Sequence, residues 1–134
     1  MTRQFAALSD PDSLVAVVGA TDSPGKYGGI IYRDLKSRGH RVVAVNPNRS
    51  TVDGDPAYPN LSSLPERPDI VNVVVGPQDG LGIVAEWARL EGTSIWFQPG
   101  SHDGHVLDAA RGAGMDVIDG NCIMVVDRLL ATSA

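Results

Sequence analysis

The chain has 134 residues, 43% of them hydrophobic and 20% charged, which is typical of one globular domain and untypical of disordered or fibrous proteins. Its net charge of -5 at pH 7 disfavours nucleic acid and anionic membrane surfaces as partners, because the summed field repels phosphates. The single cysteine, Cys122, excludes an intramolecular disulfide framework. We therefore expect one domain over residues 1–134, located in the cytoplasm, with no nucleic-acid or membrane partner.

Short apolar runs alternate with helical patterns along the chain. The predicted strands cover residues 14–18, 41–45, 69–75, 94–98 and 115–118. The predicted helices cover residues 3–8, as a short lid or edge helix, then 27–38, 78–90, about 106–110 and 123–130. Residues 50–68 contain four of the nine prolines and are expected to be mostly loop, with a short strand near 57–58 and a helical turn at 61–64.

This alternation predicts an α/β fold with a single doubly wound parallel sheet, of the Rossmann-like type. In such sheets ligands bind beyond the carboxyl ends of the strands, near the point where the strand order reverses. We therefore expect the loops at Gly19, Asn46, Gly76, Pro99 and Gly120 to share one rim.

The stretch SLVAVVGATDSPGKYGG, residues 13–29, combines an apolar strand, a loop of small residues and the start of a helix. Small residues let the backbone approach a phosphate group, and the free N–H groups of the helix N-terminus stabilise its charge. The stretch therefore predicts a phosphate-binding turn.

The same turn departs from the fingerprint of dinucleotide-binding proteins. That fingerprint has closely spaced glycines and an acidic residue after the second strand, which binds the ribose. Here the first turn spaces Gly19 and Gly25 six residues apart, and the second strand ends in Asn46-Pro47 with no carboxylate. Both departures count against NAD, while Arg49 leaves NADP open, because a guanidinium can bind its 2′-phosphate.

Five motifs together point to one family. They are VAVVGATDSPGKYG at the first turn, GHRVVAVNPN at the second strand, AYPNLSSLPERPDIVNVVV before the third, SIWFQPG at the fourth and GNC after the fifth. Over residues 14–125 the chain resembles the small stand-alone CoA-binding proteins, whose fold is that of the CoA-binding domain in the succinyl-CoA synthetase α subunit. The most specific part is the VNP corner followed by Y-x-x-L-x-x-L-P.

This resemblance implies a site for coenzyme A or an acyl-CoA built from three loops. The first-turn loop would receive the pyrophosphate and pantetheine side, the corner after the second strand would hold the nucleotide end, and the end of the third strand would line the adenine or ribose. The implied residues are Gly19, Ala20, Thr21, Asp22, Ser23, Pro24, Lys26, Asn46, Pro47, Asn48, Arg49, Val74, Val75 and Gly76.

Two other groups of residues have both a functional and a structural interpretation. His102, Asp103 and His105 could bind a metal, but Asp103 fits a helix cap better, so we expect no metal site. Cys122 could form a mixed disulfide with CoA, yet a small, buried, apolar role is favoured. The aromatic residues Trp87, Trp96 and Phe97 are expected in the core.

The phosphohistidine domain of the synthetase has no counterpart in this sequence, and the loop after the fifth strand reads Cys122-Ile123 where the family often has Cys-Pro. The main hypothesis is therefore a protein that binds CoA or an acyl-CoA without catalysis of its own, as a carrier, a sensor or a subunit. An NADP-dependent oxidoreductase fragment and a ligand-free scaffold or regulatory partner are the alternatives. A protein partner or a homo-oligomer is compatible with each.

Overall fold

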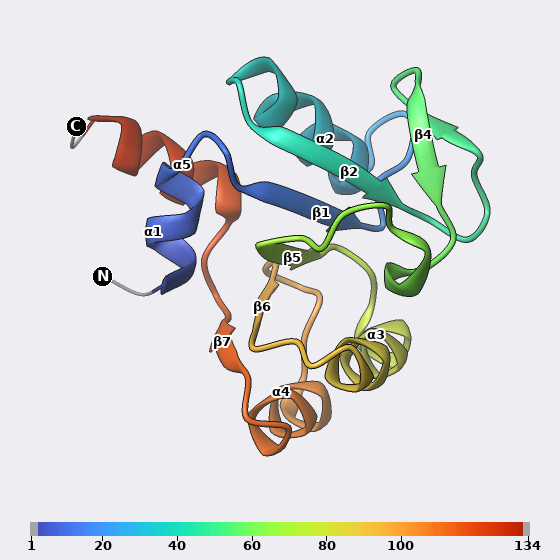
Figure 1. The fold of residues 1–134 in the computed structure, drawn as a ribbon, viewed down its shortest axis with the longest axis vertical. Coiled ribbons are helices and arrows are strands. Elements are labelled where there is room, and N and C mark those ends of the chain that lie inside the picture. Colours follow the sequence, from blue (N-terminus) through green and yellow to red (C-terminus); the bar gives the residue numbers. More distant parts are fainter. Residues whose placement is uncertain (1–2, 133–134) are drawn as a thin grey trace.

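The computed structural model describes residues 3–132 and shows a seven-stranded sheet covered on both faces by helices (Figure 1). The strands are β1 (Leu14–Val18), β2 (Arg41–Val45), β3 (Thr51–Val52), β4 (Asp55–Tyr58), β5 (Ile70–Val73), β6 (Ser94–Phe97) and β7 (Asp116–Ile118). The helices are α1 (Arg3–Ser9), α2 (Tyr27–Ser37), α3 (Pro77–Arg89), α4 (Gly104–Gly112) and α5 (Ile123–Thr132), with a 3₁₀ turn η1 at Leu61–Ser63.

The strand order is β3-β4-β2-β1-β5-β6-β7, and every neighbouring pair is parallel except β3 with β4. The chain passes from β1 outward to β2 and then returns to the other side of β1 with β5, so the order reverses between β1 and β5. This arrangement confirms the predicted doubly wound α/β sheet and places its switch point at the ends of those two strands.

The sheet separates two apolar cores, and β1 contributes to both. Every residue of β1 is buried, with Val15 and Val17 in the core beneath α1, α2 and α5, and Ala16 and Val18 in the core beneath α3 and α4. This alternation is the ordinary two-residue period of a strand that is covered on both faces. Trp96 lies in the first core and Phe97 and Trp87 in the second, as predicted.

Helix α1 covers the sheet and does not form a lid over the strand ends. Its Gln4 side chain is 1% exposed, and its amide nitrogen donates to the carbonyl oxygens of Ile95 and Asp116, each at 3.1 Å. Those carbonyls belong to β6 and β7, and α1 also packs against α5. The lid alternative was therefore wrong, because the buried face of α1 is anchored to the backbone of two strands.

Residues 51–58 form a β-hairpin where mostly loop was expected. The short strand near 57–58 is confirmed as the end of β4, which pairs with β2, but β3 was missed. Asp53 and Gly54 both have positive φ, 52° and 79°, which is the backbone of a tight hairpin turn, for which Asp-Gly is a typical sequence. The strand β3 has two residues, too few to show an alternating pattern.

Helix α2 anchors this hairpin through side chains. The hydroxyl of Tyr32 donates to Asp55 at 2.7 Å, and Lys36 donates to Asp55 at 2.8 Å and to Asp53 at 3.1 Å. Burial of the ring, together with the Asp55 carboxylate, raises the pKa of Tyr32 above its ordinary value. Hydrogen bonds from Lys36 and Tyr32 hold the pKa of Asp55 below its ordinary value. The hairpin is therefore fixed against α2.

Strand β5 ends at Val73, two residues earlier than predicted. Val73 pairs with Val18 and Phe97, the last residues of the neighbouring strands, so the ladder has no partners beyond it. Val74 and Val75 continue as half-buried residues above the switch point. The N–H of Val74 still donates to the carbonyl oxygen of Val18 at 2.8 Å, and both valines line the space beyond the strand ends.

Helix α3 ends in a left-handed residue that is not glycine. Glu91 has a φ of 61°, its N–H donates to Ala88 O at 3.0 Å, and the N–H of Gly92 donates to Trp87 O at 2.7 Å. This is a Schellman motif, in which the left-handed position usually carries glycine. Gly92 was expected to cap the helix, but its own constraint is packing, since a Cβ there would lie 2.4 Å from the Trp87 ring.

Replacing Glu91 with glycine is expected to stabilise the fold by about 0.5–1 kcal/mol, because it relieves the cost of a side chain in the left-handed region. Thermal unfolding followed by circular dichroism measures this as a rise in Tm. Replacing Gly92 with alanine is the comparison, and it should lower Tm. An unchanged or lower Tm for E91G would show that the Glu91 backbone carries no strain.

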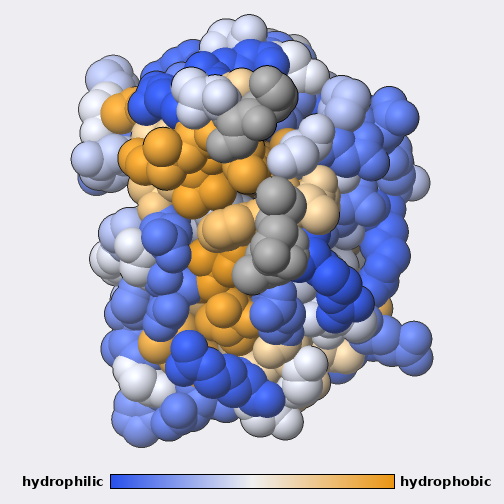
Figure 2. Space-filling model, turned by 90° about the vertical axis from the view of Figure 1, so that its left-hand side faces the viewer, coloured by the Kyte–Doolittle hydropathy of each residue, from blue (hydrophilic) through white to orange (hydrophobic). Residues whose placement is uncertain are grey.

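The helices were also compared with the length and hydropathy of a membrane span, and the surface was inspected for apolar patches. No helix among residues 3–132 is long and apolar enough to cross a membrane. Apolar side chains gather on the face formed by α1 and α5 (Figure 2), where Val125 and Leu129 on α5 are 52% and 62% exposed.

Candidate ligand site at the switch point

A cavity of about 720 Å³ lies beyond the carboxyl ends of β1, β2 and β5, at the switch point of the sheet. Cavities of this size are typical of small-molecule sites. The walls come from the loop after β1, the start of α2, the corner after β2, the loop after β5 and the start of α3. The lining residues are Val18, Gly19, Thr21, Ser23, Lys26, Tyr27, Gly28, Val45, Asn46, Pro47, Asn48, Pro59, Val74, Val75, Asp79, Gly82 and Ile83.

Helix α2 begins at this cavity and α3 begins beside it, and neither N-terminus is capped by a side chain. The N-cap residues are Lys26 for α2 and Gly76 for α3, and neither side chain accepts a hydrogen bond from its helix. By contrast, Asp103 caps α4 by accepting from Val106 N at 3.0 Å. The first N–H groups of a helix have no partner within it, so α2 and α3 offer donors and positive dipole ends to an anion.

Glycines bring the start of α2 against the loop after β1. A Cβ on Gly28 would lie 1.9 Å from the carbonyl oxygen of Gly19, and one on Gly29 would lie 2.3 Å from that of Thr21. Gly19 itself has a φ of 104°, and a Cβ there would lie 3.0 Å from Val75. Side chains at these positions would push the helix away from the loop. The sequence motif predicted a role for Gly19, whereas the requirement for glycine at Gly28 and Gly29 was not predicted.

Side-chain hydrogen bonds hold the loop after β1 in place. The amide nitrogen of Asn46 donates to Ala20 O at 2.9 Å, and Asn46 Oδ1 accepts from Asn48 N at 2.8 Å. Arg49 Nη2 donates to Ser23 Oγ at 2.8 Å. The corner after β2 is therefore connected directly to the first-turn loop, and the cavity between them is preformed in this structure.

Nine of the residues implied by the resemblance line this cavity: Gly19, Thr21, Ser23, Lys26, Asn46, Pro47, Asn48, Val74 and Val75. Four others, Ala20, Asp22, Pro24 and Arg49, line neither this cavity nor the one beside it. Ala20 is fully buried. Asp22 accepts from the backbone N–H of Asp53 at 2.8 Å and so connects the loop to the hairpin.

A second, smaller cavity of about 360 Å³ adjoins the first and shares Tyr27, Val74 and Val75 with it. It lies beyond the ends of β5 and β6 and at the start of α5. The lining residues are Tyr27, Val74, Val75, Gly76, Gln98, Pro99, Gly100, Ser101 and Cys122. Four of the five predicted rim positions thus line one of the two cavities; the fifth, Gly120, lines neither, although Cys122 from the same loop does.

The charges at the larger cavity are few. Lys26 is the cation and Asp79 the carboxylate among its described lining residues. A bound anion would therefore depend on backbone donors for much of its stabilisation, with Lys26 adding positive charge at the N-terminus of α2.

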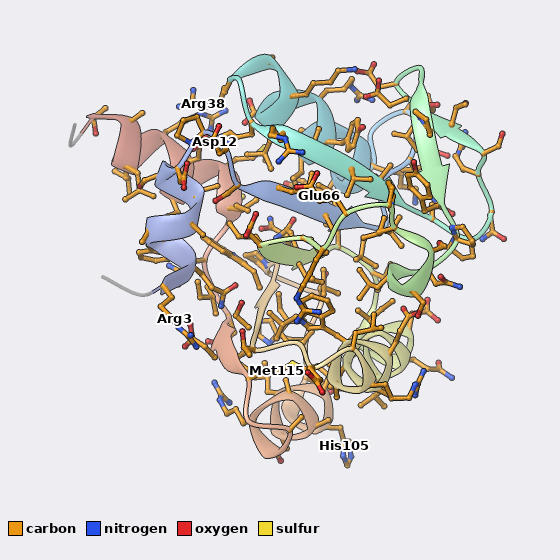
Figure 3. The ribbon with its side chains drawn as sticks, in the orientation of Figure 1. Arg3, Asp12, Arg38, Glu66, His105 and Met115 are labelled. Atoms are coloured by element: carbon orange, nitrogen blue, oxygen red, sulfur yellow. The ribbon has the colours of Figure 1, made fainter. Side chains whose placement is uncertain are left out.

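His105 and Cys122 were the other residues considered for metal binding or thiol chemistry. His105 on α4 points away from the body of the domain (Figure 3), and no group of three His, Cys, Asp or Glu side chains within residues 3–132 is arranged to hold a metal ion. Cys122 is half-buried at the smaller cavity, where its Sγ lies 3.3 Å from the amide nitrogen of Gln98.

Comparison with known proteins identifies the family. A family model described as a CoA binding domain matches residues 13–128. This chain belongs to the CoA-binding domain family. The match covers the sheet, both cavities, all of α2, α3 and α4 and the first six residues of α5, with α1 outside it.

Relatives of this CoA-binding domain include both long and short proteins. It is 29% identical to acetate–CoA ligase [ADP-forming] I of Archaeoglobus fulgidus over 131 residues, which are 90% of this chain but only 19% of that protein. It is 26% identical to the protein YneT of Bacillus subtilis, covering 83% of this chain and 82% of YneT. A solved structure from Pyrococcus furiosus, described as a conserved hypothetical protein, superposes with a TM-score of 0.81 at 37% identity, covering 84% of this chain and 97% of that one. The CoA-binding domain thus matches small proteins over most of their length and a ligase over one part.

Proposed function

We propose that this protein binds coenzyme A or an acyl-CoA without catalysis of its own, as a carrier, a sensor or a subunit of a larger acyl-CoA system. The observation that carries the proposal is the uncapped N-terminus of α2, packed through Gly28 against the first-turn loop and facing the Asn46-Pro47 corner. That arrangement suits a pyrophosphate, and an amide stands where a dinucleotide site has its acidic residue.

We match the phosphate groups of CoA with the hydrogen-bond donors and cations around the larger cavity. The pyrophosphate lies at the N-terminus of α2, beside Lys26 and the loop containing Gly19, where backbone donors are available. The nucleotide occupies the larger cavity against Asn46, Pro47 and Asn48. Arg49 is held at the edge of the loop by its bond to Ser23, and its remaining N–H groups bind the 3′-phosphate once the ligand is present.

The absence of catalysis is proposed from the charges of the larger cavity. The chain spans 19% of the length of the ADP-forming acetate–CoA ligase. The larger cavity has Lys26 and Asp79 as its charged lining residues within the described chain; Lys26 precedes α2, whereas Asp79 lies on α3. These features favour holding a ligand over transforming it.

Isothermal titration calorimetry with CoA, acetyl-CoA, NADP and NAD tests the proposal. We expect CoA to bind at least about tenfold tighter than NADP or NAD, a difference of about 1.4 kcal/mol. NAD or NADP binding tighter than CoA would favour the oxidoreductase alternative. If the titration shows no heat of binding at about 1 mM CoA, the ligand-free scaffold would be favoured.

A further inference from the structure

The smaller cavity differs chemically from the larger one. None of the described residues that line it carries a charge, and its walls include Val74, Val75, Pro99 and the ring of Tyr27. It opens next to the larger cavity, because the same two valines and Tyr27 line both. A ligand whose charged end lies in the larger cavity can therefore extend an uncharged end into the smaller one.

The amide of Gln98 in this cavity is already engaged by the protein. Gln98 is 4% exposed, its Oε1 accepts from Ile123 N at 2.8 Å and from Asn72 at 3.2 Å, and its nitrogen donates toward Cys122 Sγ. These contacts fix the amide and leave little of it to a ligand. The other polar side chains on the wall are those of Tyr27, Ser101 and Cys122, and the rest of the wall, which includes Val74, Val75 and Pro99, favours a largely apolar occupant.

We propose that the smaller cavity is an acyl subsite that selects short, uncharged, apolar acyl groups on CoA, which rests on the proposed function. Its volume of about 360 Å³ is at the lower end of the range for small-molecule sites, so a short chain fills it. An acyl group ending in a carboxylate is disfavoured relative to an apolar one, because the described wall has no charged side chain and the start of α3 at Gly76 supplies backbone N–H groups but no counter-ion.

A series of ligands measured by calorimetry on the full chain tests the subsite. The series is 3′-phospho-ADP, which lacks the pantetheine arm, then CoA, acetyl-, butyryl-, succinyl-, octanoyl- and palmitoyl-CoA. We expect butyryl-CoA to bind about tenfold tighter than acetyl-CoA, because each buried methylene contributes up to about fourfold. Succinyl-CoA, similar in size but charged, is expected to bind at least about tenfold more weakly than butyryl-CoA. Octanoyl- and palmitoyl-CoA should gain nothing beyond butyryl-CoA.

Two substitutions at one position provide a matched pair. Cys122→Leu fills part of the smaller cavity, whereas Cys122→Ala removes the same thiol without adding volume. We expect Leu to weaken butyryl-CoA binding about tenfold and Ala by less than about threefold, since Ala adds no volume to the cavity. Leu should change 3′-phospho-ADP binding by less than about twofold, because that ligand does not reach the smaller cavity. Should C122L not fold, the ligand series on the natural chain still decides the question.

Several outcomes would overturn the subsite. Equal affinity for acetyl-, butyryl- and succinyl-CoA would show that the acyl group lies outside the cavity. Affinity that rises steadily to palmitoyl-CoA would place the chain on an external surface, such as the exposed apolar face of α5. These results leave CoA binding intact and reject only the subsite. If neither CoA nor 3′-phospho-ADP binds, the proposed function fails as well.

Discussion

Replacing Gly28 with alanine is expected to abolish CoA binding at micromolar ligand and to destabilise the fold by about 2–3 kcal/mol. The new Cβ would lie 1.9 Å from the carbonyl oxygen of Gly19, so α2 must move away from the loop after β1. A bound pyrophosphate then loses backbone donors worth about 3 kcal/mol in total, which is roughly 100-fold in affinity. Calorimetry with CoA and thermal unfolding measure the two effects.

The matched control is Gly112→Ala. Gly112 is also helical and also lacks a positive φ, but a Cβ there meets no atom within 4 Å, and it lines neither cavity. This variant should keep the CoA affinity and equal or exceed the natural stability, because alanine favours helix. If G28A bound CoA as tightly as G112A, the close approach of α2 would have no role in the site.

Replacing Asn46 with aspartate tests the second part of the site and is expected to weaken CoA binding about 30-fold, or about 2 kcal/mol. The substitution removes the donor that Asn46 provides to Ala20 O and places a carboxylate against that carbonyl. It also adds negative charge to the wall of a cavity proposed to hold phosphates. CoA titrations at two salt concentrations measure the loss and show how much of it is screened.

Asn48→Asp is the matched comparison for charge alone. Asn48 lines the same cavity, and its hydrogen bond to Asn46 uses its backbone N–H, which the substitution keeps. We expect about a threefold loss, removed largely by salt. Equal losses for N46D and N48D would show that the bond from Asn46 to the loop contributes nothing to binding.

Most of the fold was predictable because its patterns are long. The apolar runs of β1 and β2 and the stripes of α2 and α3 each extend over at least five residues, enough to show a period. The switch point followed from the alternation of strands and helices. The hairpin at Thr51–Tyr58 was not recognised, although Asp53-Gly54 is a hairpin signal, because β3 has only two residues beside it.

The candidate site was less fully predictable, because its constraints act between segments distant in sequence. The need for glycine at Gly28 arises from the position of Gly19 O, and the connection of Asp22 to the hairpin arises from the packing of β3 and β4. The smaller cavity depends on residues from four separate loops and helix starts. The resemblance pointed to nine residues that line the larger cavity, but it carried no information on how the two cavities adjoin.

The most direct test of the proposed CoA site is a crystal structure of the protein co-crystallised with CoA. We expect the pyrophosphate at the N-terminus of α2, within hydrogen-bond distance of backbone N–H groups near Gly28, and the adenine side of the ligand against Asn46 and Pro47. A pyrophosphate bound elsewhere on the surface, or a nucleotide that leaves the switch point between β1 and β5 empty, would contradict it.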